Sequence, residues 1–114
     1  MPGVQTLLPV MLDHVNKGKL KIEKLIKLVC ENPCDLFGIK NKGYIKENYD
    51  ADLTIVDMNK EVVIKDNWIE SKCGWTPFNN YKVKGFPIAT IVNGEIVMEN
   101  SKIISPAKGK PLNF

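Results

Sequence analysis

The chain contains no arginine, although it carries 16 basic residues, all of them lysine. Proteins that bind nucleic acid or phosphate usually rely on arginine, because its planar guanidinium forms two parallel hydrogen bonds. The formal net charge is only +3. The densest lysine stretch, residues 17–27, mixes helix faces and has no interleaved aromatic residues, which is typical of a solvated surface. Together these features count against a nucleic-acid partner.

Long apolar runs are also absent. No segment approaches the roughly 20 apolar residues of a membrane-spanning helix, and no export signal precedes a small-residue cleavage site. Three cysteines, Cys30, Cys34 and Cys73, cannot all pair internally. We therefore expect reduced thiols in a cytoplasmic protein that contacts no membrane. The length of 114 residues, with 44% hydrophobic and 25% charged residues, fits one soluble globular domain.

Histidine occurs once, at His14. Because zinc sites need several ligands, we expect this residue to be a packing or surface residue rather than a metal ligand. Cys30-x-x-x-Cys34 with a distant Cys73 is a poor zinc pattern, and buried structural thiols are the expected interpretation. No serine-histidine-aspartate set and no glycine-rich phosphate loop is present. The residues do not support independent catalysis.

Two further sets of residues have a functional and a structural interpretation. Asp50 and Asp52 suggest a cation site or an acid–base pair, but without a larger acidic cluster we expect them to cap a turn. Trp75 and Phe78 suggest a surface for stacking a ligand. Because aromatic residues dominate packing, we expect instead that they fill the interface between helices and strands.

Helical spacing of apolar residues dominates the first 40 residues. Pro9 is expected either to kink the first helix or to precede its true start, and Gly18 is placed to end it. Asn32 is expected to cap a new helix that has Pro33 at its first position and ends at Gly38. The pattern predicts three helices, over residues 7–15, 22–29 and 32–38.

A period of two replaces the helical period after residue 40. Asn93-Gly94 is the favoured pair for a two-residue hairpin turn with positive φ at both positions. We predict short strands at 42–45, 53–56, 61–65, 88–92, 95–98 and 102–104. The resulting division is a helical segment (1–40), a small antiparallel β-domain (41–104) and an irregular, mobile tail (105–114).

Several motifs carry a resemblance to one enzyme family. Residues 43–45 read Gly-Tyr-Ile and residues 50–53 read Asp-Ala-Asp-Leu, which is similar to the start of the small β-domain that follows the barrel in cyclic amidohydrolases. Hydantoinases and allantoinases share the second element. Three other stretches resemble dihydroorotases: Met1 to Pro9, Asn32 to Gly38 (with Cys34 where alanine is usual), and Ser71-Lys72 with Trp75-Thr76-Pro77-Phe78 and Gly85.

The resemblance implies an α+β chain made of the last helices of an amidohydrolase (β/α)8 barrel followed by a small antiparallel β-domain, part of a composite β-sandwich. The family is zinc-dependent and interconverts carbamoyl aspartate and dihydroorotate. Its metal ligands (a His-x-His, a lysine, two further histidines and an aspartate) would all lie upstream. The resemblance therefore implies no bound cofactor and no catalytic or metal-binding residue in this chain. Only the backbone of Pro2 and Gly3, at the end of the active-site loop, is implied to contact substrate.

The expected function is that of the C-terminal portion of a dihydroorotase-like enzyme of pyrimidine biosynthesis, inactive by itself. Three alternatives stay open: a non-catalytic subunit or interaction module that docks on a partner chain, the C-terminal part of a hydantoinase or allantoinase, and a self-contained α+β module with an unrelated binding role. Because the predicted helices carry unpartnered apolar stripes, we expect self-association or binding to an upstream, barrel-bearing chain.

Overall fold

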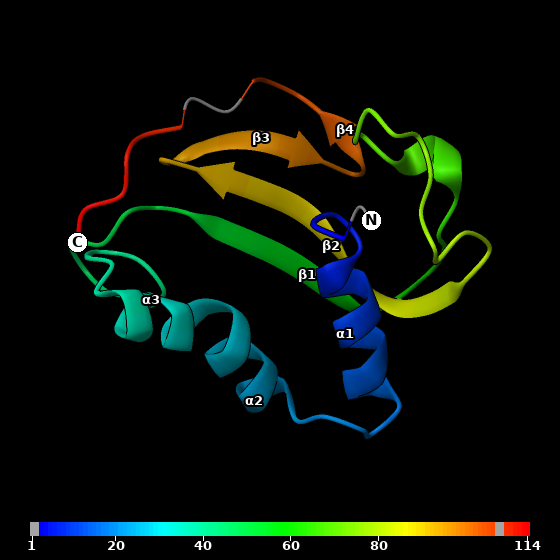
Figure 1. Ribbon diagram of the computed structural model, residues 1–114, viewed down its shortest axis with the longest axis horizontal. Helices are drawn as coiled ribbons and strands as arrows, with labels where there is room; N and C mark the ends of the chain where they lie inside the picture. The colour runs from blue at the N-terminus through cyan, green and yellow to red at the C-terminus, as the bar shows by residue number, and fades with distance from the viewer. Residues whose placement is uncertain (1–2, 107–108) are drawn as a thin grey trace. The chain divides into compact units, whose positions relative to one another are not determined.

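The computed structural model describes residues 3–106 and 109–114, in which helices precede strands (Figure 1). The strands form one four-stranded sheet in the order β1-β2-β3-β4. The part of the chain that the structure describes has no helix long and apolar enough to cross a membrane. The fold is α+β, as predicted. Its main elements are α1 (Leu7–Asn16), α2 (Ile22–Ile26), α3 (Asn32–Phe37), β1 (Leu53–Val63), β2 (Lys82–Val92), β3 (Glu95–Glu99) and β4 (Lys102–Ile103).

The first predicted helix is confirmed, and the other two are joined. Pro9 lies in the first turn of α1, where its missing N–H removes no helical hydrogen bond. Between α2 and α3 the chain forms a π turn, Lys27–Glu31, so the three make consecutive helical turns (Figure 1). The predicted cap at Asn32 is wrong, because this residue has helical φ and ψ of −58° and −41°. Gly38 ends α3 with φ 65°, as expected.

The predicted strand at 42–45 does not form. Gly43 has φ +85°, which lies outside the β region, and a Cβ there would lie 2.7 Å from both the Cys30 carbonyl oxygen and the Cys34 Sγ. The segment thus passes close against the helical turns instead of pairing in the sheet. Two other predictions change in extent: the runs 53–56 and 61–65 belong to the single strand β1, apart from residues 64 and 65, and β2 begins at Lys82 rather than at 88.

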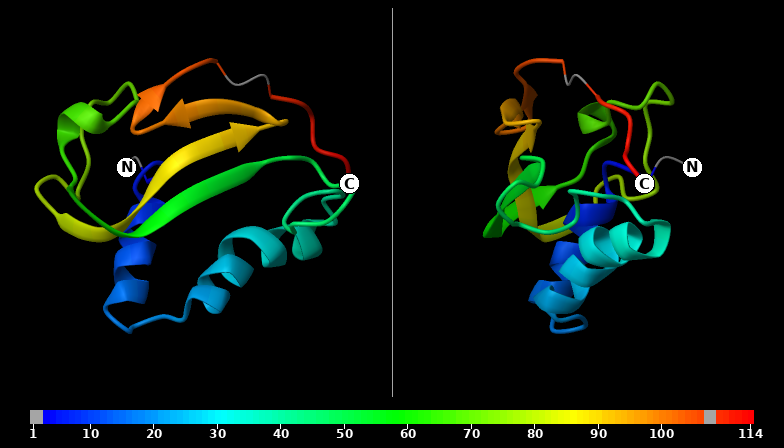
Figure 2. Two further views of the ribbon diagram at one scale, coloured as in Figure 1. Left: turned by 180° about the vertical axis from the view of Figure 1, so that it is seen from behind. Right: turned by 90° about the vertical axis from the view of Figure 1, so that its left-hand side faces the viewer.

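The predicted hairpin is confirmed. Asn93 and Gly94, with φ of 50° and 81°, connect β2 directly to β3, and the hairpin can be followed in Figure 2. The antiparallel register pairs Val92 with Glu95, then shifts between Thr90 and Ile91. The shift leaves Val97 as an extra residue on β3, a β-bulge, and its side chain is buried.

Two compact units divide the chain. Unit 1 contains Met1–Leu20 and Val56–Pro87, and unit 2 contains Lys21–Ile55 and Ile88–Phe114. The core of unit 1 is formed by Ile64, Val83 and Phe86, with the Trp68 ring centroid 5.2 Å from that of Phe86. In unit 2 the buried apolar residues are Leu25, Ala89 and Val97.

The tail has no regular structure over its described residues, as predicted, yet it is attached to unit 2. The Lys40 N–H donates to the Asn113 carbonyl oxygen at 2.8 Å. The predicted mobility of the tail stays a prediction.

Candidate functional site

The candidate substrate-contacting segment precedes α1 in unit 1. Pro2 lies outside the described residues, and Gly3 is the first described residue. The Gly3 carbonyl oxygen accepts hydrogen bonds from the Leu7 N–H at 2.9 Å and from the Thr6 hydroxyl at 3.4 Å. Thr6 is buried, whereas Val4 is 96% exposed. The turn is therefore closed by its own hydrogen bonds, with one apolar side chain projecting from it.

Gln5 holds this turn in place by a paired contact. Its Nε2 donates to the Trp68 carbonyl oxygen at 2.9 Å, and its Oε1 accepts the Glu70 N–H, also at 2.9 Å. One side-chain amide thus satisfies two backbone groups at the end of the short 3-10 turn Asp66–Trp68 and just after it. Sequence reasoning did not single out Gln5, because a lone glutamine carries no spacing signal.

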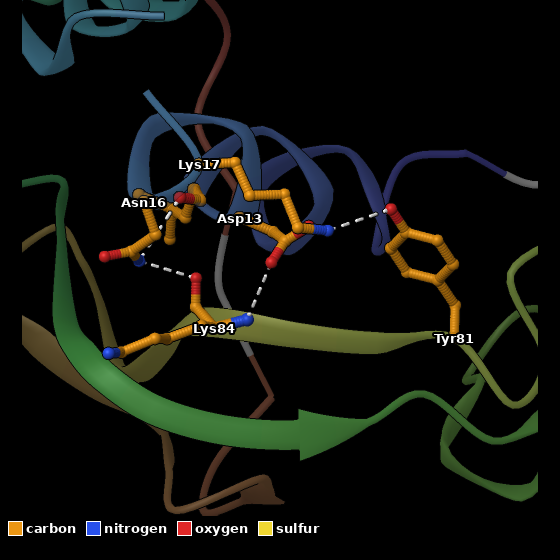
Figure 3. A network of polar contacts seen from close by, with 6 residues as sticks. Asp13, Asn16, Lys17, Tyr81 and Lys84 are labelled. Atoms are coloured by element: carbon orange, nitrogen blue, oxygen red, sulfur yellow. Dashed lines mark hydrogen bonds and ion pairs between the residues drawn. The ribbon is translucent and has the colours of Figure 1, made fainter. Parts of the chain in front are cut away.

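A polar network holds α1 on β2 (Figure 3). Asp13 is 2% exposed; its carboxylate pairs with Lys17 and accepts the Lys84 N–H at 3.1 Å. The Asn16 side-chain amide donates to the carbonyl oxygens of Lys84 at 2.7 Å and Met58 at 3.0 Å. Burial opposes ionisation of Asp13, but the hydrogen bonds from Lys17 and Lys84 outweigh it and lower its pKa.

Gly85 explains why α1 can lie this close to β2. Its φ is +100°, and a Cβ there would lie 2.9 Å from Leu12 Cβ and 3.0 Å from the Asn16 Nδ2. A glycine is thus required both by the backbone conformation and by the close approach of the helix. The network and this contact hold the C-terminal half of α1 on β2, but they present no group to a substrate.

The motif around Thr76 is likewise structural. Thr76 is buried; its N–H donates to Asp66 Oδ1 at 2.9 Å, and its hydroxyl oxygen accepts the Phe78 N–H at 3.2 Å. Phe78 packs against the core of unit 1 and meets Tyr81 edge-on at 6.0 Å. The expectation that Trp75 fills an interface is wrong, because 47% of that residue is exposed.

In unit 2 the two aspartates build a clamp, here defined as Lys42, Asp50 and Asp52. Lys42 Nζ pairs with both carboxylates, at 3.0 Å from Asp50 Oδ2. Asp52 Oδ1 accepts the Asn93 N–H at 2.8 Å; this bond, followed by the one from Lys42, lowers the Asp52 pKa. Asp52 thus caps a turn, although it is the Asn93-Gly94 turn rather than its own, and Asp50 forms an ion pair instead of a cap.

Two further polar side chains, Tyr44 in unit 2 and His14 in unit 1, differ in their hydrogen bonding. Tyr44 donates its hydroxyl to Asp35 Oδ2 at 2.7 Å, which raises the Tyr44 pKa to about 12. His14 Nδ1 is buried and has no hydrogen-bond partner within the described part of the chain. The Tyr44 hydrogen bond therefore helps to stabilise unit 2.

The cysteines are not the buried residues that we predicted. All three are free thiols; Cys30 and Cys73 are exposed and Cys34 is half-buried. Burial still raises the pKa of the Cys30 thiol. Across residues 3–106 and 109–114, no three or more histidine, cysteine, aspartate or glutamate side chains are grouped so that they could hold a metal ion. The described residues therefore offer no group of side chains that could hold the zinc of the family.

Comparison with known proteins defines the class. The model of the Amidohydrolase family matches residues 4–97, and the chain belongs to this family. It is similar to the dihydroorotase of Pyrococcus furiosus, with 44% identity over 110 residues that cover 96% of this chain and 26% of the relative. An L-hydantoinase of Paenarthrobacter aurescens is 38% identical over 104 residues. The predicted dihydroorotase resemblance is thus confirmed, and the chain spans about a quarter of the length of the curated relatives it matches.

Solved structures agree on the fold. An L-hydantoinase (dihydropyrimidinase) from Arthrobacter aurescens superimposes with a TM-score of 0.86 at 36% identity, covering 90% of this chain and 23% of that one. The inactive dihydroorotase-like domain of a Chaetomium thermophilum CAD-like multifunctional protein gives a TM-score of 0.72 at 18% identity, covering 94% and 28%. The second likeness concerns the fold alone.

Proposed function

We propose that the chain is the C-terminal portion of a dihydroorotase-like cyclic amidohydrolase, contributing the last barrel helices and most of the small β-domain. The observation that carries this proposal is the 44% identity to a dihydroorotase over nearly the whole chain. The roles of the motif residues support it. Thr76, Gly85 and Asp52 are used for turns and close packing, which are the features that a shared fold requires.

In the proposed enzyme, the chain contributes a scaffold and one edge of the pocket. The Gly3 carbonyl is occupied within its own turn, so a substrate contact at Gly3 uses its N–H. A backbone N–H donated to a carboxylate or ring carbonyl orients the substrate without changing protonation state. Gln5 and the Asp13 network keep that N–H in position by fixing the turn and the helix behind it.

Ring opening or closure of a cyclic amide needs groups that this chain does not supply. The described residues provide no grouped metal ligands, and the family's ligands belong to the upstream barrel. We therefore infer that the chain by itself neither hydrolyses dihydroorotate nor binds zinc stoichiometrically. Activity requires the barrel-bearing part, either in the same polypeptide or as a separate chain.

Exposed apolar side chains on the helical turns favour a docked state. Ile26, Leu28, Val29, Leu36 and Phe37 are each at least 39% exposed. We define these five residues as the helical apolar face. A solvated face of this kind is a contact surface by default, and in the proposed enzyme the upstream barrel covers it. The same observation supports the alternative in which the chain is a non-catalytic subunit docked on a partner.

The L-hydantoinase matches support a second candidate substrate class, the hydantoins.

The test compares the chain alone, the chain co-expressed with the upstream three quarters of the P. furiosus dihydroorotase, and that upstream part alone. Each is assayed with zinc for hydrolysis of dihydroorotate and of hydantoin. We expect turnover of dihydroorotate by the pair only. Hydantoin turnover by the pair would favour the second candidate, and chelator-sensitive turnover by the chain alone would contradict the proposal.

A further inference from the structure

The Asn93-Gly94 turn contains a chemically labile pair. In an Asn-Gly sequence the glycine amide nitrogen can attack the asparagine Cγ; a C–N bond forms, ammonia leaves, and a five-membered succinimide results. Water then opens either carbonyl of the ring and yields an aspartyl or an isoaspartyl residue. The reaction needs no co-reactant except water, and glycine favours it because it has no side chain to shield its nitrogen.

In unit 2 the attacking nitrogen is engaged. The Gly94 N–H donates to the Ala51 carbonyl oxygen at 3.0 Å. The adjacent Asn93 N–H donates to Asp52 Oδ1 at 2.8 Å. Both central residues have positive φ, and the Gly94 nitrogen becomes available to attack Cγ only when its hydrogen bond to Ala51 opens.

The clamp that provides these acceptors is itself fixed. Lys42 bridges Asp50 and Asp52, and the Asp50 N–H donates to the Asn41 carbonyl oxygen at 2.9 Å. Asp52 is the member that reaches the hairpin, because its two carboxylate oxygens hold Lys42 and Asn93 respectively. Asp50 contributes only a salt bridge to Lys42 among the side-chain contacts of the clamp.

We propose that Asn93 is a covalent modification site, a deamidation site whose rate is controlled by opening of the clamp. Deamidation places a new carboxylate in the turn that Asp52 caps, and repulsion between the two opposes reclosure. The isoaspartyl product also adds a methylene to the backbone, which is incompatible with the two-residue register that pairs Val92 with Glu95. A single modification therefore opens the β2-β3 hairpin at this end.

The experiment follows deamidation by peptide mass mapping of the intact chain during incubation at neutral pH. We compare the native chain, the denatured chain, Asp52→Ala and the matched control Asp50→Ala. Asn100-Ser101 serves as an internal reference, since it lies in another turn whose Asn100 N–H donates to the Ile88 carbonyl oxygen at 2.8 Å.

We expect the native chain to deamidate at Asn93 at least tenfold more slowly than the denatured chain. Asp52→Ala should raise the deamidation rate of Asn93 about tenfold, because the loss of one charge-assisted hydrogen bond shifts a local opening equilibrium by about that factor. The rate at Asn93 should change little in Asp50→Ala, and the rate at Asn100 should change little in either variant. No acceleration in a folded Asp52→Ala chain would overturn the proposal. If Asn93 and Asn100 accelerate equally in Asp52→Ala, that variant is unfolding globally. The deamidation rates of Asn93 in the native and the denatured unsubstituted chain then decide, and equal rates would contradict the proposal.

Discussion

Unit 1 and unit 2 use their apolar residues in different ways. In unit 1 the side chains of Leu12, Ile64, Val83 and Phe86 are at most 2% exposed, and buried polar groups such as Asp13 have partners. In unit 2 most of the large apolar residues on the described helical turns are exposed, and polar contacts such as the Lys42 ion pairs stabilise the loops. Unit 1 thus has the larger buried core, whereas unit 2 exposes most of the apolar residues on its helical turns.

The largest loss of stability should come from adding a side chain at Gly85, where α1 lies close to β2. Gly85→Ala forces a Cβ to within 2.9 Å of Leu12 Cβ at φ +100°, and strain plus overpacking should cost about 2–5 kcal/mol of unfolding free energy. The control Gly18→Ala has φ +71° but nothing within 4 Å, so it should cost only about 1 kcal/mol. Urea unfolding measures both. Equal losses would mean that α1 does not rely on this contact.

Removing the buried carboxylate of unit 1 should be nearly as costly. Asp13→Ala leaves the Lys84 N–H without its acceptor, a loss of about 2–3 kcal/mol. Because the folded pKa of Asp13 is lowered from 3.8, its contribution is present above that value and is lost as pH falls below it. Asp13→Asn should therefore flatten the acid limb of the stability curve. Asp57→Ala is an exposed control, and an unchanged acid limb in Asp13→Asn would contradict the assignment.

Polar substitution of the helical apolar face should weaken association without destabilising unit 2. Leu36 and Phe37 are 77% and 63% exposed, so replacing both by serine removes little intramolecular packing. If these side chains are buried on association, each contributes about 1.5–3 kcal/mol, and the dimer dissociation constant should rise at least about tenfold. Sedimentation velocity measures this, with Ile45→Ser, at a residue outside that face, as the control. A chain that is monomeric before mutation would weaken the contrast between the units.

The smallest expected effect comes from a substitution in the β2-β3 hairpin of unit 2. Gly94 has φ +81° with nothing within 4 Å of an added Cβ, so Gly94→Val costs only the conformational strain of a β-branched residue, about 1–3 kcal/mol. The loss should appear as reduced amide protection in β3, with the core of unit 1 unaffected. Hydrogen exchange resolves the two. Equal loss of protection in both units would show that they unfold as one.

Sequence reasoning located the features whose causes are local. The apolar period predicted α1, Gly38 ends α3 with φ 65°, and Asn93-Gly94 forms the predicted turn. It failed at the π turn that joins α2 and α3 and at the 42–45 segment, because both depend on neighbours distant in sequence or on hydrogen-bond spacing that composition does not report. The substrate contact expected at Pro2 and Gly3 came only from a resemblance and stays a prediction. Gln5 and Asp13 were not singled out, because their partners lie more than 60 residues away.

The sequence by itself determined the family, the α+β class and the positions where turns occur, since these follow from motif wording, periodicity and the conformational preferences of single residues. The tertiary structure alone decided what those residues are for. Gly85 allows α1 to pack closely on β2, Asp52 accepts a hydrogen bond from the hairpin, and Cys30 and Cys73 are exposed rather than buried. The physical reason is that a side chain's environment is set by contacts between segments far apart in the chain, which local preference does not encode.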